Sequence, residues 1–355
     1  MVDMQKKIEK IVVPANSTIL DALKKMDDLQ RRLLLVFDRE KYVNLLSVGD
    51  LQRAIIKNFP LDTKVTKILR TETKVCRSDE SIESIKAKMF KFRTECMPVL
   101  DMDENLVEVY FWEDMFPYEE KRVEHNLKLP VIIMAGGKGS RLKPLTNVLP
   151  KPLIPIGNKT ILENIMDRFV SSGCTDFYLS VNYKSEMIRQ YFESLGNNDY
   201  QIKYFEEDKP LGTAGSLFML NGRIDKTFFI SNCDILIEED YSEIYKYHRE
   251  HKNELTIVAA LKHYPIPYGT IETGEEGRLI KLTEKPELTF KINSGMYILE
   301  PHLLKEIPAN EFFHITELIE KIRAREGRIG VFPVSEKSWK DIGEWDEYLR
   351  SLNIK

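Results

Sequence analysis

Two amphipathic helices are predicted in the first 115 positions, 63 residues apart. Each has apolar residues at the i, i+3, i+4 and i+7 spacing or most of it, and each precedes an apolar strand ending in aspartate. A pattern that occurs twice at this period predicts a paired module whose halves bury a shared face. The helical positions are Ile19, Ala22, Leu23 and Met26, then Ile82, Ile85 and Met89, and the strands lie at 33–38 and 96–101.

The hydrophobic pattern changes after residue 130. The run VIIM at 131–134 has no polar alternation, as expected of a strand buried on both faces. Similar runs alternate with helical patterns that close with glycine. This alternation predicts right-handed βαβ units and a mixed, mostly parallel sheet, with ligands at the carboxyl ends of the strands. The further strands are expected at 177–182, 227–234 and 254–261, and the helices at 161–173 and 185–196.

A polar, charged segment bounded by prolines separates the two halves, at 116–130. Such composition is typical of a linker. We therefore expect an N-terminal module at 1–120, a linker at 121–129 and a C-terminal domain at 130–355.

Composition narrows the class of protein. The chain is 43% hydrophobic and 30% charged, ordinary for a globular protein. Its net charge of −4 argues against nucleic-acid binding, and no apolar run is long enough to cross a membrane. The N-terminus shows no signal-peptide pattern, and four scattered cysteines favour neither a zinc site nor a disulfide framework. We therefore expect a protein of the cytoplasm. The cysteines are Cys76, Cys96, Cys174 and Cys233.

A glycine-rich segment follows the first strand of the second half. Gly136, Gly137 and Gly139 allow a tight turn whose free N–H groups suit phosphate oxygens. The spacing matches neither a P-loop nor a dinucleotide-binding fingerprint. Arg141 can make forked hydrogen bonds to a polyphosphate, and Lys151 lies between two prolines that fix its backbone. A lysine held in this way suits the charge that develops during phosphoryl transfer.

The string GGKGSRLKPLTNVLPKPLIPIG resembles the motif GGxGTRLxPLTxxxPKP of the sugar-1-phosphate nucleotidyltransferases, with Ser140 where that family has threonine. The resemblance implies an α/β domain of the Rossmann-like, glycosyltransferase-A-like kind. It implies catalytic roles for Arg141 and Lys151. It also implies nucleotide contacts from Ala135, Gly136, Gly137, Gly139 and Ser140.

Five further segments resemble the same family in the expected order, at 211–216, 232–234, 284–286, 293–297 and 339–343. The resemblance implies two aspartates that bind Mg²⁺, a lysine that holds the sugar phosphate, and residues that contact the sugar or the nucleotide. Cys233 stands where the family has glycine, which puts the turn before the first aspartate in question. The metal ligands are Asp234 and Asp341, the lysine is Lys285, Glu284 and Asn293 face the sugar, and Gly212 approaches both nucleotide and sugar.

The reaction implied is transfer of a nucleotidyl group from an NTP to a hexose 1-phosphate, with release of pyrophosphate. The motif LGTAG together with the N-terminal module favours GTP, while thymidylyl, uridylyl and cytidylyl transfer stay open. Structural interpretations also stay open. Asp234 and Asp341 are suited to capping helices, Glu284 and Lys285 to pairing on the surface, and Asn293 to bonding a loop.

The N-terminal repeat resembles a tandem CBS-domain pair, an α+β module in which a hydroxyl three residues before an aspartate binds adenine nucleotides. The first repeat keeps this pattern as Ser47 and Asp50, with Asn44 where glycine is usual. The second keeps Asp114 but has Phe111 in the hydroxyl position. The resemblance implies an adenine nucleotide ligand and a homodimer of stacked pairs.

Two other interpretations remain besides an active enzyme that is regulated by a nucleotide bound to its N-terminal module. The aspartates of the repeats are equally suited to capping helices. The whole chain is alternatively an adenylate sensor with a degenerate transferase domain. Three histidines, His248, His251 and His263, match no motif, and we expect them to be solvated on the surface.

Overall fold

The computed structural model describes residues 2–71, 74–92, 94–116, 126–197 and 199–352. It divides into two compact units, Met1–Arg122 and Val123–Lys355. Residues 121–125 of the expected linker lie outside the described residues. Residues 126–129 form no helix or strand, and Leu127 and Lys128 donate backbone hydrogen bonds to residues 172 and 173 of the second unit.

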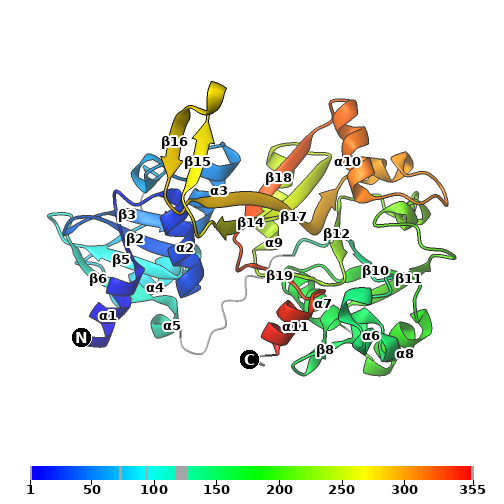
Figure 1. Cartoon of the computed structure of the whole chain (residues 1–355). Helices are drawn as coiled ribbons and strands as arrows, with labels where there is room; N and C mark the ends of the chain where they lie inside the picture. Colours follow the sequence, from blue (N-terminus) through cyan, green and yellow to red (C-terminus); the bar gives the residue numbers. More distant parts are fainter. Residues whose placement is uncertain (1, 72–73, 93, 117–125, 198, 353–355) are drawn as a thin grey trace. The chain divides into compact units, whose positions relative to one another are not determined.

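The first unit confirms the predicted repeat. Each half has the order strand, helix, strand, strand, helix, with the first two strands parallel and the last two antiparallel (Figure 1). An additional helix, α1 (Val2–Ile11), precedes the first half. The first half contains β1 (Val12–Pro14), α2 (Ile19–Leu29), β2 (Leu33–Asp38), β3 (Lys41–Ser47) and α3 (Val48–Ile56). The second contains β4 (Cys76–Arg77), α4 (Ile82–Phe92), β5 (Cys96–Leu100), β6 (Leu106–Phe111) and α5 (Trp112–Met115).

The two halves differ at the start of their last helix. In α3 the Ser47 side chain accepts from the backbone N–H of Asp50, whose carboxylate accepts from the backbone N–H of Ser47. This reciprocal cap satisfies two N–H groups at the start of a nine-residue helix. Phe111 offers no such cap, and α5 is only four residues long. The second copy of the helix is thus both uncapped and shorter than the first.

The second unit is built on a sheet of seven strands in the order β11-β10-β7-β12-β17-β14-β18 (Figure 1). Neighbours are parallel except at β17, which runs against both β12 and β14. The sheet is thus mixed and mostly parallel, as predicted. Its strands are β7 (Val131–Met134), β10 (Asp176–Val181), β11 (Gln201–Glu206), β12 (Phe228–Asn232), β14 (Leu255–Pro265), β17 (Glu287–Leu299) and β18 (Ile329–Val334).

The central strands are buried on both faces, which explains their unbroken apolar runs. Phe229 packs against Phe169 of α7 and Tyr241 of α9, with ring centroids 5.4 and 6.0 Å away. Its neighbour Phe228 points to the other face, into a core shared with Leu318 of α10. The helices of this unit are α6 (Leu145–Val148), α7 (Ile161–Ser171), α8 (Ser185–Leu195), α9 (Tyr241–Glu250), α10 (Ile315–Ala324) and α11 (Trp345–Ser351).

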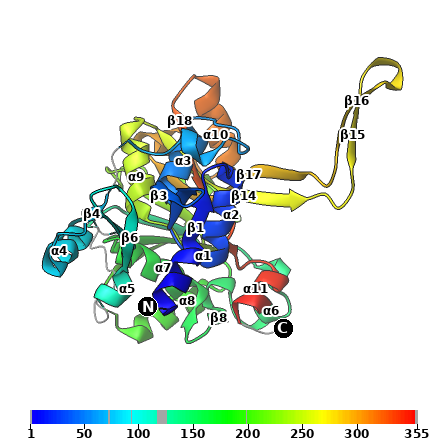
Figure 2. The same cartoon turned by 90° about the vertical axis from the view of Figure 1, so that its left-hand side faces the viewer.

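In the described part of this unit, three two-stranded ribbons lie outside the main sheet. One follows β12 and brings residues 235–237 beside residues 339–341. Another prolongs β14 and β17 into a hairpin that stands away from the other elements of its unit (Figure 2). The ribbons are β8 (Pro155–Ile156) with β9 (Lys159–Thr160), β13 (Ile235–Ile237) with β19 (Trp339–Asp341), and β15 (Thr270–Thr273) with β16 (Leu279–Thr283). Among the described residues, none of the helices is long and apolar enough to cross a membrane.

The expectation for two of the three histidines was wrong. His248 is 1% exposed, and its ring lies between Thr256 and Glu300, with Nδ1 2.8 Å and Nε2 3.1 Å from their oxygens. Burial lowers the pKa of His248, although Glu300 opposes this effect. His263 is partly buried and contacts Thr289. His251 is exposed, as expected. Helical spacing on α9 did not reveal that His248 faces the sheet.

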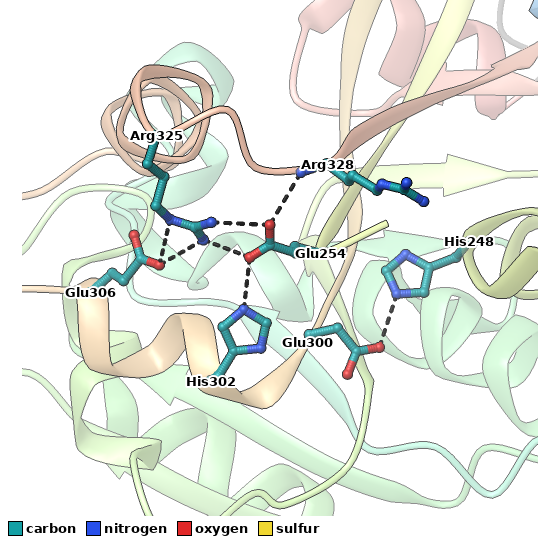
Figure 3. A network of polar contacts seen from close by, with 7 residues as sticks. All are labelled: His248, Glu254, Glu300, His302, Glu306, Arg325 and Arg328. Carbon is teal, nitrogen blue, oxygen red and sulfur yellow. Dashed lines mark hydrogen bonds and ion pairs between the residues drawn. The ribbon is translucent and has the colours of Figure 1, made fainter. Parts of the chain in front are cut away.

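A polar network around Glu254, the residue before β14, joins three strand ends of the main sheet (Figure 3). Arg325 donates to both carboxylate oxygens of Glu254, at 3.0 and 2.6 Å. His302 lies 2.8 Å from the same carboxylate, and the backbone N–H of Arg328 donates to it at 3.1 Å. These bonds, chiefly those from Arg325, lower the pKa of Glu254 from 4.5 to about 2. The network thus ties the starts of β14 and β18 to the end of β17.

We expect Glu254→Gln to reduce the free energy of unfolding at pH 7 by roughly 2 kcal/mol, because hydrogen bonds to a charged group are lost. The lowered pKa stabilises the fold above pH 4.5, and that contribution is lost as pH falls toward about 2. Urea denaturation between pH 3 and 7 should therefore show a smaller gap between wild type and variant at the acid end. Glu250→Gln, an exposed change on α9, is the control. A gap independent of pH would contradict this account.

Candidate functional site

Two aspartates meet because of the β13–β19 ribbon. Ile235 is paired with Asp341, and the backbone N–H of Ile342 donates to the carbonyl of Asp234 at 2.9 Å. The register therefore places two carboxylates, 107 positions apart in the chain, in the same cleft. Burial, and then the charge of Asp234, raise the pKa of Asp341 above its ordinary value.

Two basic side chains face this carboxylate pair. Lys151, which is 7% exposed, forms an ion pair with Asp234. Nη2 of Arg141 lies 3.8 Å from the same carboxylate, and Nη1 of Arg141 pairs with Glu344. The hydrogen bond that Arg141 donates to Glu344 accordingly raises the pKa of Arg141. The structure thus brings together two of the three predicted catalytic residues, Arg141 and Lys151, with both predicted metal ligands.

Gly343 marks the centre of the cluster. A Cβ atom at this position would lie 2.5 Å from Oδ2 of Asp234, 2.6 Å from Nζ of Lys151 and 2.8 Å from Oδ1 of Asp341. The motif therefore requires glycine after Ile342, since any side chain would displace these charged groups. Two carboxylates are suitable donors for a hard divalent cation. Within the residues that the structure describes, no group of three or more metal-binding side chains gathers.

The glycine-rich loop lies against the side chain of Lys151 at Gly139. Gly139 has φ of +62°, and a Cβ atom there would lie 2.7 Å from Thr146 and 3.0 Å from Cβ of Lys151. Gly139 is therefore needed both for its backbone conformation and for its contact with the lysine. A Cβ atom on Gly137 would meet nothing within 4 Å, so this residue borders open space.

Other predicted nucleotide contacts occupy different positions around this loop. The backbone N–H of Ala135 donates to the carbonyl of Ser180 at 2.8 Å and is used by the sheet. A Cβ atom on Gly136 would lie 3.3 Å from Asn182, and Ser140 is exposed. Gly212, with φ of +82°, packs so closely on Phe313 that a Cβ atom would lie 2.7 Å from its carbonyl oxygen. The glycine thus fits its loop against residues 311–313.

A cleft of about 440 Å³ opens beside the carboxylates. It includes the predicted Asn293, whose side-chain oxygen accepts from the backbone N–H of Gly295 at 3.1 Å. Glu284 and Lys285 are exposed between β16 and β17 and are not among the lining residues. The lining residues are Arg141, Thr213, Asn232, Asp234, Ile235, Asn293, Ser294, Gly295, Tyr297, His314, Ile315, Thr316, Trp339 and Asp341.

Several lining residues were missed by the sequence interpretation. Asn232 and Trp339 belong to the motifs of the two aspartates, and their position there was an available signal. His314 and Thr316, at the start of α10, belong to no recognised motif. Thr213 connects the 211–216 loop to the start of α10, since its hydroxyl accepts from the backbone N–H of Ile315 at 3.0 Å.

The question raised by Cys233 is answered by its backbone. Cys233 is not among the residues with positive φ, so the turn before Asp234 does not need glycine. Its side chain is buried, which raises the thiol pKa to about 12. All four cysteines are buried, and none of them forms a disulfide.

A second cavity, of about 200 Å³, lies within the first unit. It includes Ser47 and Asp50, and Asp50 is 3% exposed and accepts from Nε of Arg70 at 2.6 Å. Hydrogen bonds from Ser47 and Arg70 outweigh the effect of burial and lower the pKa of Asp50. Asp114 is not in this lining and pairs with Lys7 at 2.9 Å. The lining comprises Arg32, Leu33, Asn44, Leu45, Ser47, Val48, Asp50, Arg70, Lys74, Phe92, Thr94 and Glu95.

Comparison with known proteins agrees with these two units. Residues 130–354 match the family described as Nucleotidyl transferase, and residues 3–57 match the CBS domain. Similar curated proteins include the mannose-1-phosphate guanylyltransferase catalytic subunit beta of Danio rerio, 32% identical over 231 residues, which are 63% of this chain and 64% of that protein. Mannose-1-phosphate guanylyltransferase 1 of Arabidopsis thaliana is 30% identical, over 64% of each chain. The chain thus spans less than two thirds of the length of these relatives.

The fold is also found among solved structures. HddC from Yersinia pseudotuberculosis is 25% identical, with a TM-score of 0.50 over 63% of this chain and 98% of that one. Another structure of HddC, 24% identical with a TM-score of 0.50, is described as complexed with GMP-PN. The chain, with its transferase motif at the strand ends and its CBS domain at the N-terminus, belongs to the nucleotidyl transferase family.

Proposed function

We propose that the chain transfers a nucleotidyl group, preferably guanylyl, from an NTP to a hexose 1-phosphate and releases pyrophosphate. The observation that carries this proposal is the meeting of Asp234, Asp341, Lys151 and Arg141 beside the glycine-rich loop. The preference for GTP is supported by the names of the similar curated proteins. Thymidylyl, uridylyl and cytidylyl transfer are the alternatives within the family.

The proposed reaction is an in-line displacement. A phosphate oxygen of the sugar 1-phosphate attacks the α-phosphorus of the NTP, the bond from that phosphorus to the bridging oxygen breaks, and pyrophosphate leaves. No general base is needed, because the nucleophilic oxygen is already anionic. Such a reaction depends on positioning and on charge neutralisation.

The chain's own residues supply both requirements. Lys151 is buried, so its ammonium acts in a region of low dielectric where it stabilises charge strongly. Arg141 can turn its guanidinium from Asp234 and Glu344 toward the triphosphate. Asn293 faces the same cleft and is suited to a sugar hydroxyl, and Lys285 is assigned to the sugar phosphate by family resemblance.

Asp234 and Asp341 are the residues that would hold Mg²⁺. Their two carboxylates and the small space around Gly343 fit a hard cation that also takes water and phosphate oxygens as ligands. When bound, the ion supplies positive charge to the reacting phosphates. Lys151 already neutralises part of the same negative charge without it.

Pyrophosphate release is the first test of the proposal. Four NTPs are screened with Mg²⁺ against a panel of hexose 1-phosphates, including mannose and glucosamine 1-phosphate. We expect turnover with one pair and preference for GTP. Turnover with another NTP would overturn the guanylyl assignment. No turnover with any pair, from folded protein that binds AMP, would favour the adenylate sensor.

The metal assignment predicts that Asp234→Asn and Asp341→Asn each lower kcat by on the order of 10²-fold at ordinary Mg²⁺, since one anionic donor is lost. Part of the loss in kcat should be restored by excess Mg²⁺ if the remaining carboxylate still binds. Asp346→Asn, a change at an exposed carboxylate on α11, is the control. Normal turnover of Asp234→Asn across the Mg²⁺ titration would exclude its metal role.

We also propose that an adenine nucleotide binds the cavity of the first unit and alters transferase kinetics. Ser47 and Asp50 are suited to ribose hydroxyls, while Arg32, Arg70 and Lys74 offer positive charge for phosphates. In this cavity Arg70 is bonded to Asp50, and its guanidinium is available to exchange that partner for a phosphate.

Arg70→Gln should therefore weaken the binding of AMP or ATP by about tenfold, because one phosphate contact is removed. Isothermal titration of the full chain measures binding, and pyrophosphate release with and without AMP measures the effect on turnover. Lys67→Gln, at an exposed position outside the cavity, is the control. Equal AMP response in wild type and Arg70→Gln would exclude regulation through this cavity.

A further inference from the structure

The hairpin at the end of β14 and β17 is a segment without a core. We call residues 262–291 the arm, comprising the far halves of those two strands and the β15–β16 ribbon. No residue of the arm is buried. Figure 2 shows the β15–β16 end standing clear of the other elements of its unit. The arm therefore contributes nothing to the interior of its own unit.

An ordinary surface ribbon exposes its polar face and covers its apolar face, and the arm does the reverse. Tyr264 lies directly opposite Leu288, and these residues are 47% and 45% exposed. Phe290, two positions along β17, is 52% exposed and meets the Tyr264 ring edge-on at 6.0 Å. The other face carries His263 and Thr289, which hydrogen-bond at 2.8 Å. The apolar face is thus directed to solvent, and the polar face is partly covered.

The end of the arm continues this apolar character. Ile271 and Leu282 are cross-strand partners on one face and are 62% and 61% exposed. Leu279 and Ile280, where the register shifts, are 58% and 67% exposed. The adjacent pair on the opposite face, Glu272 and Lys281, is charged.

An isolated two-stranded ribbon is only marginally stable in water. Large apolar patches on a soluble protein commonly mark interaction sites. Eight large apolar side chains of the arm, each roughly half to three quarters exposed, present on the order of 800 Å², about what one partner buries in a stable interface. They are Tyr264, Tyr268, Ile271, Leu279, Ile280, Leu282, Leu288 and Phe290.

The charges of the arm indicate which partner fits. Five acidic and five basic residues lie between 262 and 291, so two arms brought together carry no net repulsion. A partner that is strongly acidic or strongly basic would find no complementary charge here. The acidic residues are Glu272, Glu275, Glu276, Glu284 and Glu287, and the basic ones are Lys262, Arg278, Lys281, Lys285 and Lys291.

We propose that the apolar face of the arm packs against the same face of a second copy of this chain. A two-fold axis would make this contact self-complementary, and apolar side chains would meet apolar side chains. This interface is separate from the stacking of CBS pairs that family resemblance implies. It does not depend on the proposed function, since only the exposed side chains of the arm carry it.

Site-directed cross-linking of the full chain tests the proposal. The four natural cysteines are buried, so a single new cysteine reports on its own surroundings. Thr273→Cys, two positions along β15 from Ile271 and on the same face, is treated with a short bifunctional maleimide, and Lys246→Cys on α9 is the control. We expect a covalent dimer from the arm variant and none from the control. No dimer from the arm variant, or equal dimer from both, would overturn the proposal.

A second substitution separates a true interface from random encounter. Leu282→Glu, introduced together with Thr273→Cys, places a charge in the apolar contact and should reduce the cross-linked fraction about tenfold. Lys281→Gln also changes one charge but lies on the opposite face, and should leave cross-linking unchanged. Far-UV circular dichroism checks that each variant is folded. Equal cross-linking with Leu282→Glu and Lys281→Gln would contradict the assigned face.

Discussion

The mutual repulsion of Asp234 and Asp341 is the constraint on which the rest of the site depends. The pairing of β13 with β19 holds both carboxylates in one cleft, where burial and their proximity oppose ionisation of Asp341. Positive charge must therefore be kept nearby. Lys151 and Arg141 supply it from two parts of one continuous motif. The negative and positive side chains of the cluster therefore lie together before substrate binds. When a metal ion or a triphosphate binds, these side chains exchange partners and do not first have to be brought together.

This requirement explains features of the local sequence. Gly343 leaves room for the charged atoms, and Gly139 allows its loop to lie against the stem of Lys151. Prolines on both sides of Lys151 limit the conformations that its backbone must lose on folding. The charged residues around Glu254 have a different role from those of the cleft. There Arg325 and the carboxylates of Glu254 and Glu306 form a network that joins strand ends and takes no part in the cleft.

Much of this arrangement was predictable because it rests on local pattern. Unbroken apolar runs identified the buried strands. The motif around Lys151 and the short motifs at 232–234 and 339–343 identified the site residues that the glycine-rich loop and the β13–β19 ribbon bring together. Contacts that depend on tertiary structure could not be predicted from the sequence. His314 and Thr316 reach the cleft only because 211–216 packs on 311–313, and His248 is buried only because α9 turns that face to the sheet. Ser47 and Asp50 illustrate a third case, in which the side chains that cap α3 also line a cavity, so the capping interpretation leaves ligand binding open.

The length of β17 has a mechanical consequence. This strand spans 13 residues, its pairing with β14 is regular from Glu287 to Asn293, and the register shifts beyond Asn293, where Gly295 has a φ of +86°. Phe290 and Asn293 are only three positions apart on it, roughly 10 Å along a stiff, hydrogen-bonded element. A load applied to the outer end of the strand would therefore tilt the wall of the cleft, with the buried stretch from Ser294 to Leu299 as its fulcrum. The strand is built as a lever, so whatever holds its free end also sets the orientation of the Asn293 amide in the cleft.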